Sequence, residues 1–443
     1  MNSHALRGNL SMSTLEVTII ALGLFFLMGM PIFMSLILSG VVAIVSGGFL
    51  PLSVIHNSLF DGLNLFPLLA IPCFVVAGTI MEYGNITHQI VDVVKQLVGR
   101  MPGGLGITTI MACTFFAAIS GSGPGTVAAV GTILIPAMVR NGYSPQYAAA
   151  AASSGGTIGI LIPPSNPMII YAIIGNLSVT AMFTAGVVPG LIVASTMVGT
   201  AVLLAKRNGF VADESIPAFN LRVFLKSCGR CSFALATPVI ILGSIYSGYA
   251  TPVEASVVAI VWALFVGVII NRALKWEHLM SALLEGAMVC GAVLLIVGAS
   301  SLFGKMLTYE QAPQRLTELV MGISNNPEIV LLMIVAVLYV LGMFMETLST
   351  IIILAPVLLP MIKALGIDPI HFGVILVVTN NVAMLTPPLG VNLFVASRIA
   401  DISVEKISVA VLPYLLALTL CILLFVYCPA LSTWLPAYLG IGQ

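Results

Sequence analysis

Apolar stretches long enough to cross a lipid bilayer recur along the whole sequence. A helix needs about 20 mostly apolar residues to span the hydrocarbon core. Such stretches lie at 14–48, 64–83, 180–205, 231–271, 287–304 and 409–432. Hydrophobic residues make up 59% of the 443 residues and charged residues only 7%, where a soluble domain carries about a quarter. The sequence therefore predicts an all-α polytopic membrane protein.

The charge and cysteine patterns exclude two other classes. The formal net charge is +0, and no basic run is present to bind nucleic-acid phosphates. The seven cysteines have no framework spacing, which argues against a disulfide scaffold. Cys228 and Cys231 have the spacing of half a zinc site, but no second pair or nearby His completes it. No transition metal and no organic cofactor are expected.

The sequence repeats itself. Residues 126–172 align without gaps with residues 350–396 after a shift of 224 positions, and four of the nine identities are prolines. The matched pairs are Thr126 with Thr350, Leu134 with Leu358, Pro136 with Pro360, Gly142 with Gly366, Pro145 with Pro369, Leu161 with Leu385, Pro163 with Pro387, Pro164 with Pro388, and Ala172 with Ala396. Apolar composition alone does not produce this shared order of prolines and glycines. We predict two homologous halves, 1–215 and 231–443, joined by a connector at 216–230.

Each half contains an apolar hairpin with a polar, helix-breaking tip. Hairpin 105–140 turns at Ser120-Gly-Ser-Gly-Pro-Gly125, and hairpin 328–364 turns at Glu346-Thr-Leu-Ser-Thr350. We expect the arms to be too short to cross the membrane comfortably. A polar tip persists at membrane depth only where it is buried in protein or lines a wet cavity. Both hairpins are therefore predicted to be re-entrant.

Positive charge gives the orientation. The connector region carries Lys206, Arg207, Arg222, Lys226 and Arg230, which places it in the cytoplasm. With re-entrant hairpins each half has about five spans, an odd number, so the second half is inverted relative to the first. Of the 16 Lys and Arg residues, all but Arg7, Lys305, Arg315 and Lys363 then lie on the cytoplasmic side. Both termini are predicted to lie outside.

A broken helix is expected after each hairpin, at 144–175 and 369–397. The breaks are Ser153-Ser-Gly-Gly-Thr157 through Ile162-Pro-Pro-Ser-Asn166, and Thr379-Asn-Asn381 through Thr386-Pro-Pro-Leu-Gly390. Proline removes a backbone donor and disfavours the α conformation of the residue before it. The freed carbonyls and hydroxyls suit sodium, and helix N-termini beyond the breaks suit an anion. Since these stretches contain no Lys or Arg, an acidic substrate must rely on backbone amides, Asn and hydroxyl donors.

Five motifs, in order, carry a family resemblance. They are Ser120-Gly-Ser-Gly-Pro-Gly-Thr-Val-Ala-Ala-Val-Gly131, Ile162-Pro-Pro-Ser-Asn-Pro-Met168, Ala185-Gly-Val-Val-Pro-Gly190, Thr251-Pro-Val-Glu-Ala255 and Thr386-Pro-Pro-Leu-Gly390. From about Leu15 to Pro436 the chain resembles the large permease (M) subunit of tripartite ATP-independent periplasmic (TRAP) transporters, the DctM-like family. The resemblance implies an elevator-type carrier in the bacterial inner membrane that imports organic acids, such as dicarboxylates or sialic acid, often with sodium. It also implies two partners, a small four-span membrane subunit and a periplasmic substrate-binding protein.

The resemblance also implies site residues. One ion site would be framed by Ser120, Ser122, Gly155, Gly156 and Thr157, and the second by Thr347, Ser349, Thr350, Thr379, Asn380 and Thr386. The substrate would contact the breaks at Pro163, Pro164, Ser165, Asn166, Asn381, Pro387, Pro388 and Asn392. Gly123-Pro124 departs from the small or hydroxyl residues expected at the first tip, which puts side-chain coordination there in doubt.

Several readings stay open for single residues. Glu346 is predicted either to help an ion or proton site or to cap the second arm of its hairpin. Asn380 and Asn381 are predicted either to contact a ligand or to form an interhelical hydrogen bond. Glu254, after Pro252, is expected to be a first-turn acid favoured by the helix dipole. The amphipathic stretches 86–98 and 311–322 are predicted to be surface arms that link a mobile domain to a scaffold.

Other functions were compared with the carrier. A self-sufficient divalent-anion/sodium symporter shares hairpins and Pro-Pro breaks, and it is the nearest alternative. An intramembrane hydrolase needs a nucleophile with a base or a paired acid at matching depth. No His is expected at the midplane, and no second intramembrane acid is expected to match Glu346. We therefore predict a carrier and not an enzyme or a channel.

Overall fold

The computed structural model describes residues 13–48, 50–210, 219–387 and 390–441. These residues form 21 α-helices and three short 3-10 or π segments, with no strand among them. The helices up to the connector are α1 (Thr14–Leu27), α2 (Ile32–Gly47), α3 (Ser53–Leu63), α4 (Ala70–Tyr83), α5 (Ile86–Val98), α6 (Gly104–Ser120), α7 (Gly123–Arg140), α8 (Pro145–Gly156), α9 (Asn166–Gly175) and α10 (Val179–Arg207). The remainder are α11 (Leu221–Arg230), α12 (Ser232–Tyr246), α13 (Pro252–Leu264), α14 (Trp276–Tyr309), α15 (Ala312–Ile323), α16 (Pro327–Gly342), α17 (Thr347–Ala364), α18 (Pro369–Ala383), α19 (Val391–Ala400), α20 (Val404–Tyr427) and α21 (Ala430–Tyr438). The prediction of an all-α membrane protein is confirmed.

The order of helices repeats at the offset found in the sequence. A shift of 224 residues places the bounds of α7 on those of α17. The helices α5, α6, α8, α9 and α10 begin within two residues of the shifted starts of α15, α16, α18, α19 and α20. Proline stands in the first turn of both α8 and α18, where its missing N–H costs no helical hydrogen bond. The boundaries proposed for the two halves stay a prediction.

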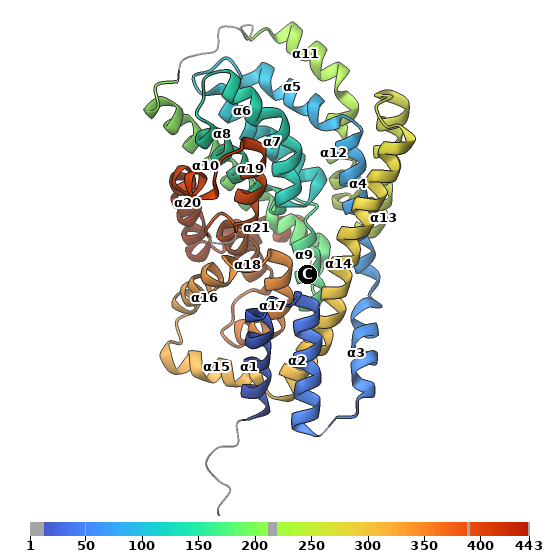
Figure 1. Cartoon of the computed structure of the whole chain (residues 1–443), viewed down its shortest axis with the longest axis vertical. Helices are drawn as coiled ribbons and strands as arrows, with labels where there is room; N and C mark the ends of the chain where they lie inside the picture. The colour runs from blue at the N-terminus through green and yellow to red at the C-terminus, as the bar shows by residue number, and fades with distance from the viewer. Residues whose placement is uncertain (1–12, 49, 211–218, 388–389, 442–443) are drawn as a thin grey trace, which may run out of the picture.

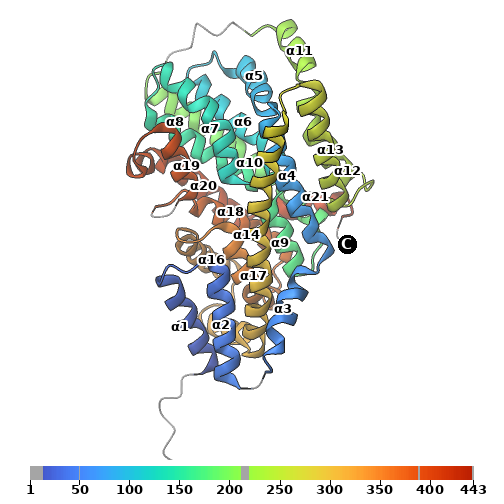
Figure 2. The ribbon, with the colours of Figure 1, turned by 45° about the vertical axis from the view of Figure 1, so that its right-hand side comes forward.

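The helices pack into two groups. The first, here called the frame, contains α2, α3, α4, α13 and α14, with α14 packed against α2, α3 and α4. Figure 2 shows α14 running along much of the length of the molecule beside α4 and α3. The second, here called the hairpin group, contains α6 to α10 and α16 to α20, in which α19 packs on α7 and α8, and α9 packs on α17. Each helix that follows a break therefore packs on the hairpin of the other half.

The amphipathic helices α5 and α15 connect the two groups. Each follows a frame helix in the chain, α4 or α14, and precedes the first arm of a hairpin, α6 or α16. They lie at opposite ends of the molecule, α5 near the connector helix α11 and α15 near α1 and α2 (Figure 1). This placement agrees with arms that link a mobile domain to its scaffold.

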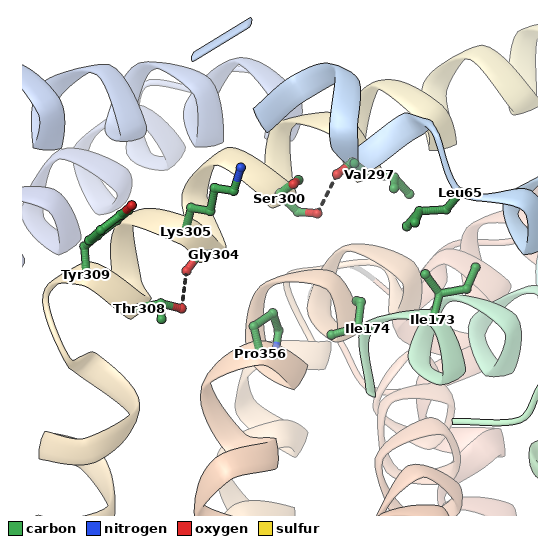
Figure 3. Close-up of a pocket in the computed structure, with 12 residues that line it drawn as sticks. Leu65, Ile173, Ile174, Val297, Ser300, Gly304, Lys305, Thr308, Tyr309 and Pro356 are labelled. Atoms are coloured by element: carbon green, nitrogen blue, oxygen red, sulfur yellow. Dashed lines mark hydrogen bonds between the residues drawn. The ribbon is translucent and has the colours of Figure 1, made fainter. Parts of the chain in front are cut away.

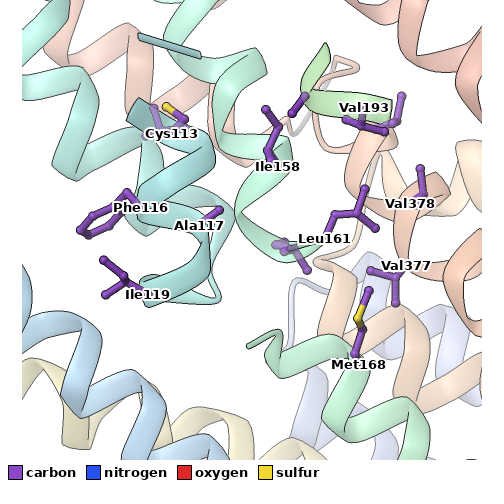
Figure 4. Packing of buried hydrophobic residues seen from close by; sticks show 14 of the residues in the cluster. Cys113, Phe116, Ala117, Ile119, Ile158, Leu161, Met168, Val193, Val377 and Val378 are labelled. Carbon is purple, nitrogen blue, oxygen red and sulfur yellow. The ribbon is translucent and has the colours of Figure 1, made fainter. Parts of the chain in front are cut away.

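Apolar packing encloses the first break. The buried side chains of Met168 in α9 and Val377 in α18 lie beside Leu161 of the broken segment, and Ile158 belongs to the same buried cluster (Figure 4). The backbone between α8 and α9 therefore lies inside the protein. Irregular backbone requires such burial if it is to lie at membrane depth.

Length and composition identify seven helices, or up to nine if each of two bent helix pairs is one span, that could cross a membrane among the described residues. Both Gly123–Arg140 and Thr347–Ala364 are among the seven. The prediction that every hairpin arm is too short was therefore wrong for α7 and α17. The hairpin interpretation rests instead on the turn between the arms, where Gly121 has a φ of 60°. The count of five spans in each half stays a prediction.

Candidate ion and substrate site

The tips of the two hairpins border one cavity. It has a volume of about 470 Å³, and its wall includes Ser120, Gly121 and Ser122 of the first tip and Glu346 and Thr347 of the second. The opposite wall comes from the frame helices α4 and α14. The cavity therefore lies between the hairpin group and the frame.

The first tip is a tight turn that packs on the first break. A side chain at Gly121 would place its Cβ 2.7 Å from the carbonyl oxygen of Pro164, so this turn requires glycine. Ser122 caps α7 by accepting a hydrogen bond of 3.4 Å from the backbone N–H of Gly125. Its carbonyl also accepts a hydrogen bond of 2.7 Å from the Thr126 hydroxyl. The tip is thus held by its own hydrogen bonds and by direct backbone contact with the break.

Asn392 of α19 lies beside this tip. Its amide is close to both Gly123 and Gly156, because a Cβ on either glycine would lie 3.3 to 3.4 Å from an Asn392 side-chain atom. Asn392 is 0% exposed, and neither Oδ1 nor Nδ2 has a hydrogen-bond partner within the described chain. An unpaired buried amide costs about 1–3 kcal/mol. Asn392 was predicted to contact the substrate; the structure places it next to the residues predicted for the first ion site, and it is not among the described residues that line the cavity.

The other predicted members of the first ion group are buried where α8 ends. Gly155 and Gly156 close α8, and Thr157 begins the 3-10 segment Thr157–Ile160. The Thr157 hydroxyl donates a hydrogen bond of 2.7 Å to the carbonyl of Ser154. A Cβ on Gly156 would lie 3.0 Å from the carbonyl oxygen of Gly123, so the tip and the break are in close contact.

The second tip begins α17. Thr347, Ser349 and Thr350 are buried in its first turn, and Glu346 occupies the N-cap position without a side-chain capping hydrogen bond. The Thr350 hydroxyl instead donates a hydrogen bond of 3.1 Å to the Glu346 backbone carbonyl. The structure thus contradicts the alternative that the Glu346 carboxylate caps this helix. The exposed Glu346 side chain lines the cavity.

Unpaired oxygens gather around this second tip and the helix behind it. Thr379 and Asn380 of α18 are 0% exposed. The Asn380 amide nitrogen donates a hydrogen bond of 3.0 Å to the Leu376 carbonyl of its own helix. Four side-chain oxygens of the predicted ion group have no partner in the described residues: Ser349 Oγ, Thr379 Oγ1, Asn380 Oδ1 and Thr386 Oγ1. Buried polar atoms are normally paired, so this concentration needs an explanation.

Asn381 connects α18 to the first break. The second break was predicted to begin at Thr379, but this was wrong, because α18 continues to Ala383. The Asn381 side-chain amide donates a hydrogen bond to the backbone carbonyl of Thr157. Of the two predicted roles, the interhelical hydrogen bond is therefore the one that the structure contains. The Asn381 Oδ1 atom stays without a partner among the described residues.

The remaining predicted substrate residues are divided between the cavity and its surroundings. Asn166 lines the cavity, and its Oδ1 has no partner in the described chain. Pro163, Pro164 and Ser165 are buried, and the Ser165 hydroxyl caps α9 by accepting a 3.4 Å hydrogen bond from Met168 N–H. Pro387 is exposed after α18, and Pro388 lies outside the described residues.

Four helix N-termini face the cavity. First-turn residues of α7, α9, α17 and α19 all contribute to its wall: Pro124 and Gly125, Asn166 and Pro167, Thr347 and Leu348, and Val391. The unpaired N–H groups of a helix N-terminus carry a partial positive charge. No Lys or Arg is among the described residues that line the cavity. The backbone N–H groups are therefore the source of positive potential at these four helix ends, which suits a carboxylate group placed against them.

Two further acids line the same cavity and were missed from the sequence. Glu82 of α4 and Glu285 of α14 belong to the frame wall, opposite Glu346. Tyr83 donates a hydrogen bond of 3.5 Å to Glu285. The expectation that no intramembrane acid matches Glu346 was therefore wrong. Glu285 interrupts the long apolar helix α14, and Glu82 stands one residue before the end of α4, which marks both as candidates. The sequence does not show which face of each helix meets the hairpins.

Comparison with known proteins identifies the family. Residues 19–431 match the family model described as "Tripartite ATP-independent periplasmic transporter, DctM component". The chain belongs to this DctM family. A relative from Pseudomonas aeruginosa, named C4-dicarboxylate TRAP transporter large permease protein DctM, is 39% identical over 92% of this chain and 95% of its own. The predicted resemblance is confirmed.

Another DctM relative is longer than this chain. The isethionate TRAP transporter permease protein DctMQ of Oleidesulfovibrio alaskensis is 38% identical over 94% of this chain, which spans 64% of that protein. Both relatives are named as transporter permeases, in agreement with the prediction that this chain is not an enzyme.

A solved structure shares the fold. The crystal structure of the YdaH transporter of Alcanivorax borkumensis superposes with a TM-score of 0.63 over 88% of this chain and 89% of that chain. The two sequences are 16% identical, so this similarity concerns the fold alone.

Proposed function

We propose that this DctM-family chain is the membrane carrier of a sodium-coupled importer of organic anions. It works with a small membrane subunit and a periplasmic binding protein in the bacterial inner membrane, with both termini outside. The observation that carries this proposal is the set of unpaired buried oxygens behind both hairpin tips, next to a cavity that four helix N-termini face.

Sodium fits the unpaired oxygens. A hard cation binds carbonyl, hydroxyl and amide oxygens, and transporters commonly hold their coupling ions at broken helices. In the second group, Ser349, Thr379 and Asn380 offer such oxygens within buried helices. In the first group, the Asn392 side-chain amide lies beside Gly123 and Gly156, with its Oδ1 atom next to Gly123. A bound ion would remove the energetic cost of leaving these atoms unpaired.

An organic anion fits the cavity. Its volume of about 470 Å³ lies within the usual range of about 300–1,000 Å³ for small-molecule sites. The helix N-termini and Asn166 supply neutral donors for a carboxylate. Sodium bound behind the tips adds positive charge that partly offsets the three acids of the cavity, Glu82, Glu285 and Glu346. The relatives named for C4-dicarboxylate and isethionate transport also take anions.

The movement that follows is an elevator motion. The cavity separates the hairpin group from the frame, and α5 and α15 join the two groups, as does the connector region with α11 and α12. Sliding of the hairpin group along α14, with α5 and α15 as arms, would carry the tips and their ligands from one side of the membrane to the other.

The test is reconstitution in liposomes with the two co-encoded partner proteins. The expected result is uptake of an organic anion that requires all three proteins and an inward sodium gradient. Equal uptake with an inward potassium gradient would remove sodium from the mechanism. Uptake by this chain alone would favour the self-sufficient symporter.

A further inference from the structure

A second cavity lies at the boundary between the frame and the hairpin group. It has a volume of about 480 Å³ and is enclosed by α3, α9, α14 and α17 (Figure 3). Ile173 and Pro356 form its wall on the hairpin side, and Leu65, Ser301 and Lys305 lie on the frame side. None of its residues belongs to the site around the hairpin tips.

Both cavities lie along one face of α14. Glu285, Val289, Val293 and Ile296 line the first cavity, and Val297, Ser300, Gly304 and Thr308 line the second. These positions are separated mostly by three or four residues, the spacing of one helix face. From Val289 to Gly304 the helix rises about 22 Å. One continuous stripe of α14 therefore connects the two cavities.

The two cavities differ in charge. The described lining of the first contains three acids and no base, whereas the second contains Lys305. The Lys305 Nζ atom lies 3.3 Å from Asp61 Oδ2, and the two side chains are 43% and 64% exposed. An exposed pair of this kind contributes only about 0–1 kcal/mol. An anion that enters the cavity can therefore displace Asp61 from the ammonium group at little cost.

The second cavity is placed on the side opposite the connector. Lys305 is near the end of α14 from which α15 begins, and Figure 1 shows α15 at the far end of the molecule from α11. If the basic connector is cytoplasmic, this cavity opens on the periplasmic half. That is the side from which an imported substrate arrives.

We propose that the cavity at Lys305 is a receiving site for the anionic substrate. The ammonium group of Lys305 binds a carboxylate or sulfonate group of the incoming molecule before the hairpin tips reach it along α14. Asp61 holds Lys305 in place while the site is empty. This inference rests on the proposed function and adds to it a second substrate station and the residue that recognises the charge.

The test uses the reconstituted three-protein transporter with labelled succinate and isethionate as probes. With Lys305→Gln, the KM for the transported probe should rise about fivefold with little change in kcat, because a surface ion pair contributes up to about 1 kcal/mol. With Lys305→Arg, the KM should stay near the wild-type value. With Asp61→Asn, the KM should fall or stay unchanged, because the competing carboxylate is removed. Lys363→Gln is the matched control, since Lys363 is an exposed lysine of α17 outside the cavity.

The outcomes separate this inference from the proposed function. Uptake of a probe by the wild-type complex that does not depend on the sodium gradient would overturn the proposed function and, with it, this inference. Wild-type uptake with an unchanged KM in Lys305→Gln would overturn the receiving site alone. Equal losses in Lys305→Gln and Asp61→Asn would show that the ion pair is only structural and would also overturn it.

Discussion

The side-chain amide of Asn381 in α18 bonds to the backbone carbonyl of Thr157, and the two residues are 224 positions apart. That separation is the offset that relates the two halves of the chain. The last turn of α18 therefore meets the first break, and residues predicted for the two ion sites lie next to each other there.

Asn381→Ala is expected to lower stability and weaken the response to sodium. Loss of a buried hydrogen bond costs about 1–3 kcal/mol, and the Thr157 carbonyl would no longer be fixed. Thermal unfolding of the purified protein in sodium and in choline measures both effects. Asn141→Ala is the control, because that amide bonds only to the Ala137 carbonyl of its own helix. An unchanged difference between the two salts would contradict a role for Asn381 in the ion site.

Ser349→Ala is expected to separate ion binding from folding. The Ser349 hydroxyl is buried and unpaired within the described residues, so its removal should not lower the melting temperature in choline. A ligand that binds the folded state stabilises it by mass action, about 2.7 kcal/mol at 100 times its Kd. The rise in melting temperature caused by sodium should therefore be smaller in the variant than in the wild type. Ser39→Ala is the matched control, since the buried Ser39 hydroxyl donates a hydrogen bond of 2.6 Å to the Ser35 carbonyl. If sodium raises the melting temperature of Ser349→Ala as much as that of the wild type, Ser349 is excluded as a ligand.

Gly121→Ala is expected to abolish transport, whereas Gly142→Ala should only reduce stability. Both glycines have positive φ, 60° and 82°, which costs alanine about 1–2 kcal/mol. At Gly121 the new Cβ would also lie 2.7 Å from the Pro164 carbonyl oxygen, while at Gly142 nothing lies within 4 Å. Sodium-driven uptake, normalised to the amount of folded protein, compares the two variants. Equal uptake would show that contact between the tip and the break is not required.

Glu285→Gln is expected to lower the KM for an anionic substrate about two- to fivefold. Its carboxylate lies on the frame wall of the cavity, where it repels a ligand of the same charge. The KM of uptake at saturating sodium measures this effect. Glu277→Gln is the control, because Glu277 is an exposed acid of the same helix outside the cavity. A higher KM would instead indicate that Glu285 binds a coupling cation.

Local chemistry explains which features could be predicted. The length of an apolar stretch predicts a membrane helix, because in lipid every backbone polar group must be hydrogen-bonded within its own helix. The turn at Gly121, the serine cap at Ser122 and the proline starts of α8 and α18 depend on residues only a few positions apart. The capping box at Glu254 is equally local, with Thr251 N–H bonded to the glutamate at 2.8 Å. Local backbone chemistry also places the breaks after both hairpins.

Two features that the sequence did not predict both depend on the position of a helix. The estimate that all hairpin arms are too short counted residues only up to the polar tips, whereas α7 and α17 begin at the tips themselves and extend for 18 residues. The position of Asn392 beside Gly123 and Gly156 was also not predicted, because α19 crosses from its own half to pack on α7 and α8. Both features concern where a helix begins or lies, and not whether it forms.

The sequence by itself determined the class of protein, the repeat, the two hairpins and the two breaks, because apolarity, glycine and proline act on the backbone within a few residues. The tertiary structure decided which polar groups meet. Glu82 and Glu285 face Glu346 only because α4 and α14 turn those sides toward the hairpin group. Asn381 reaches Thr157 only because the two halves pack against each other. Such contacts depend on the packing of helices that are distant in the chain, 224 residues apart for Asn381 and Thr157, which no local pattern contains.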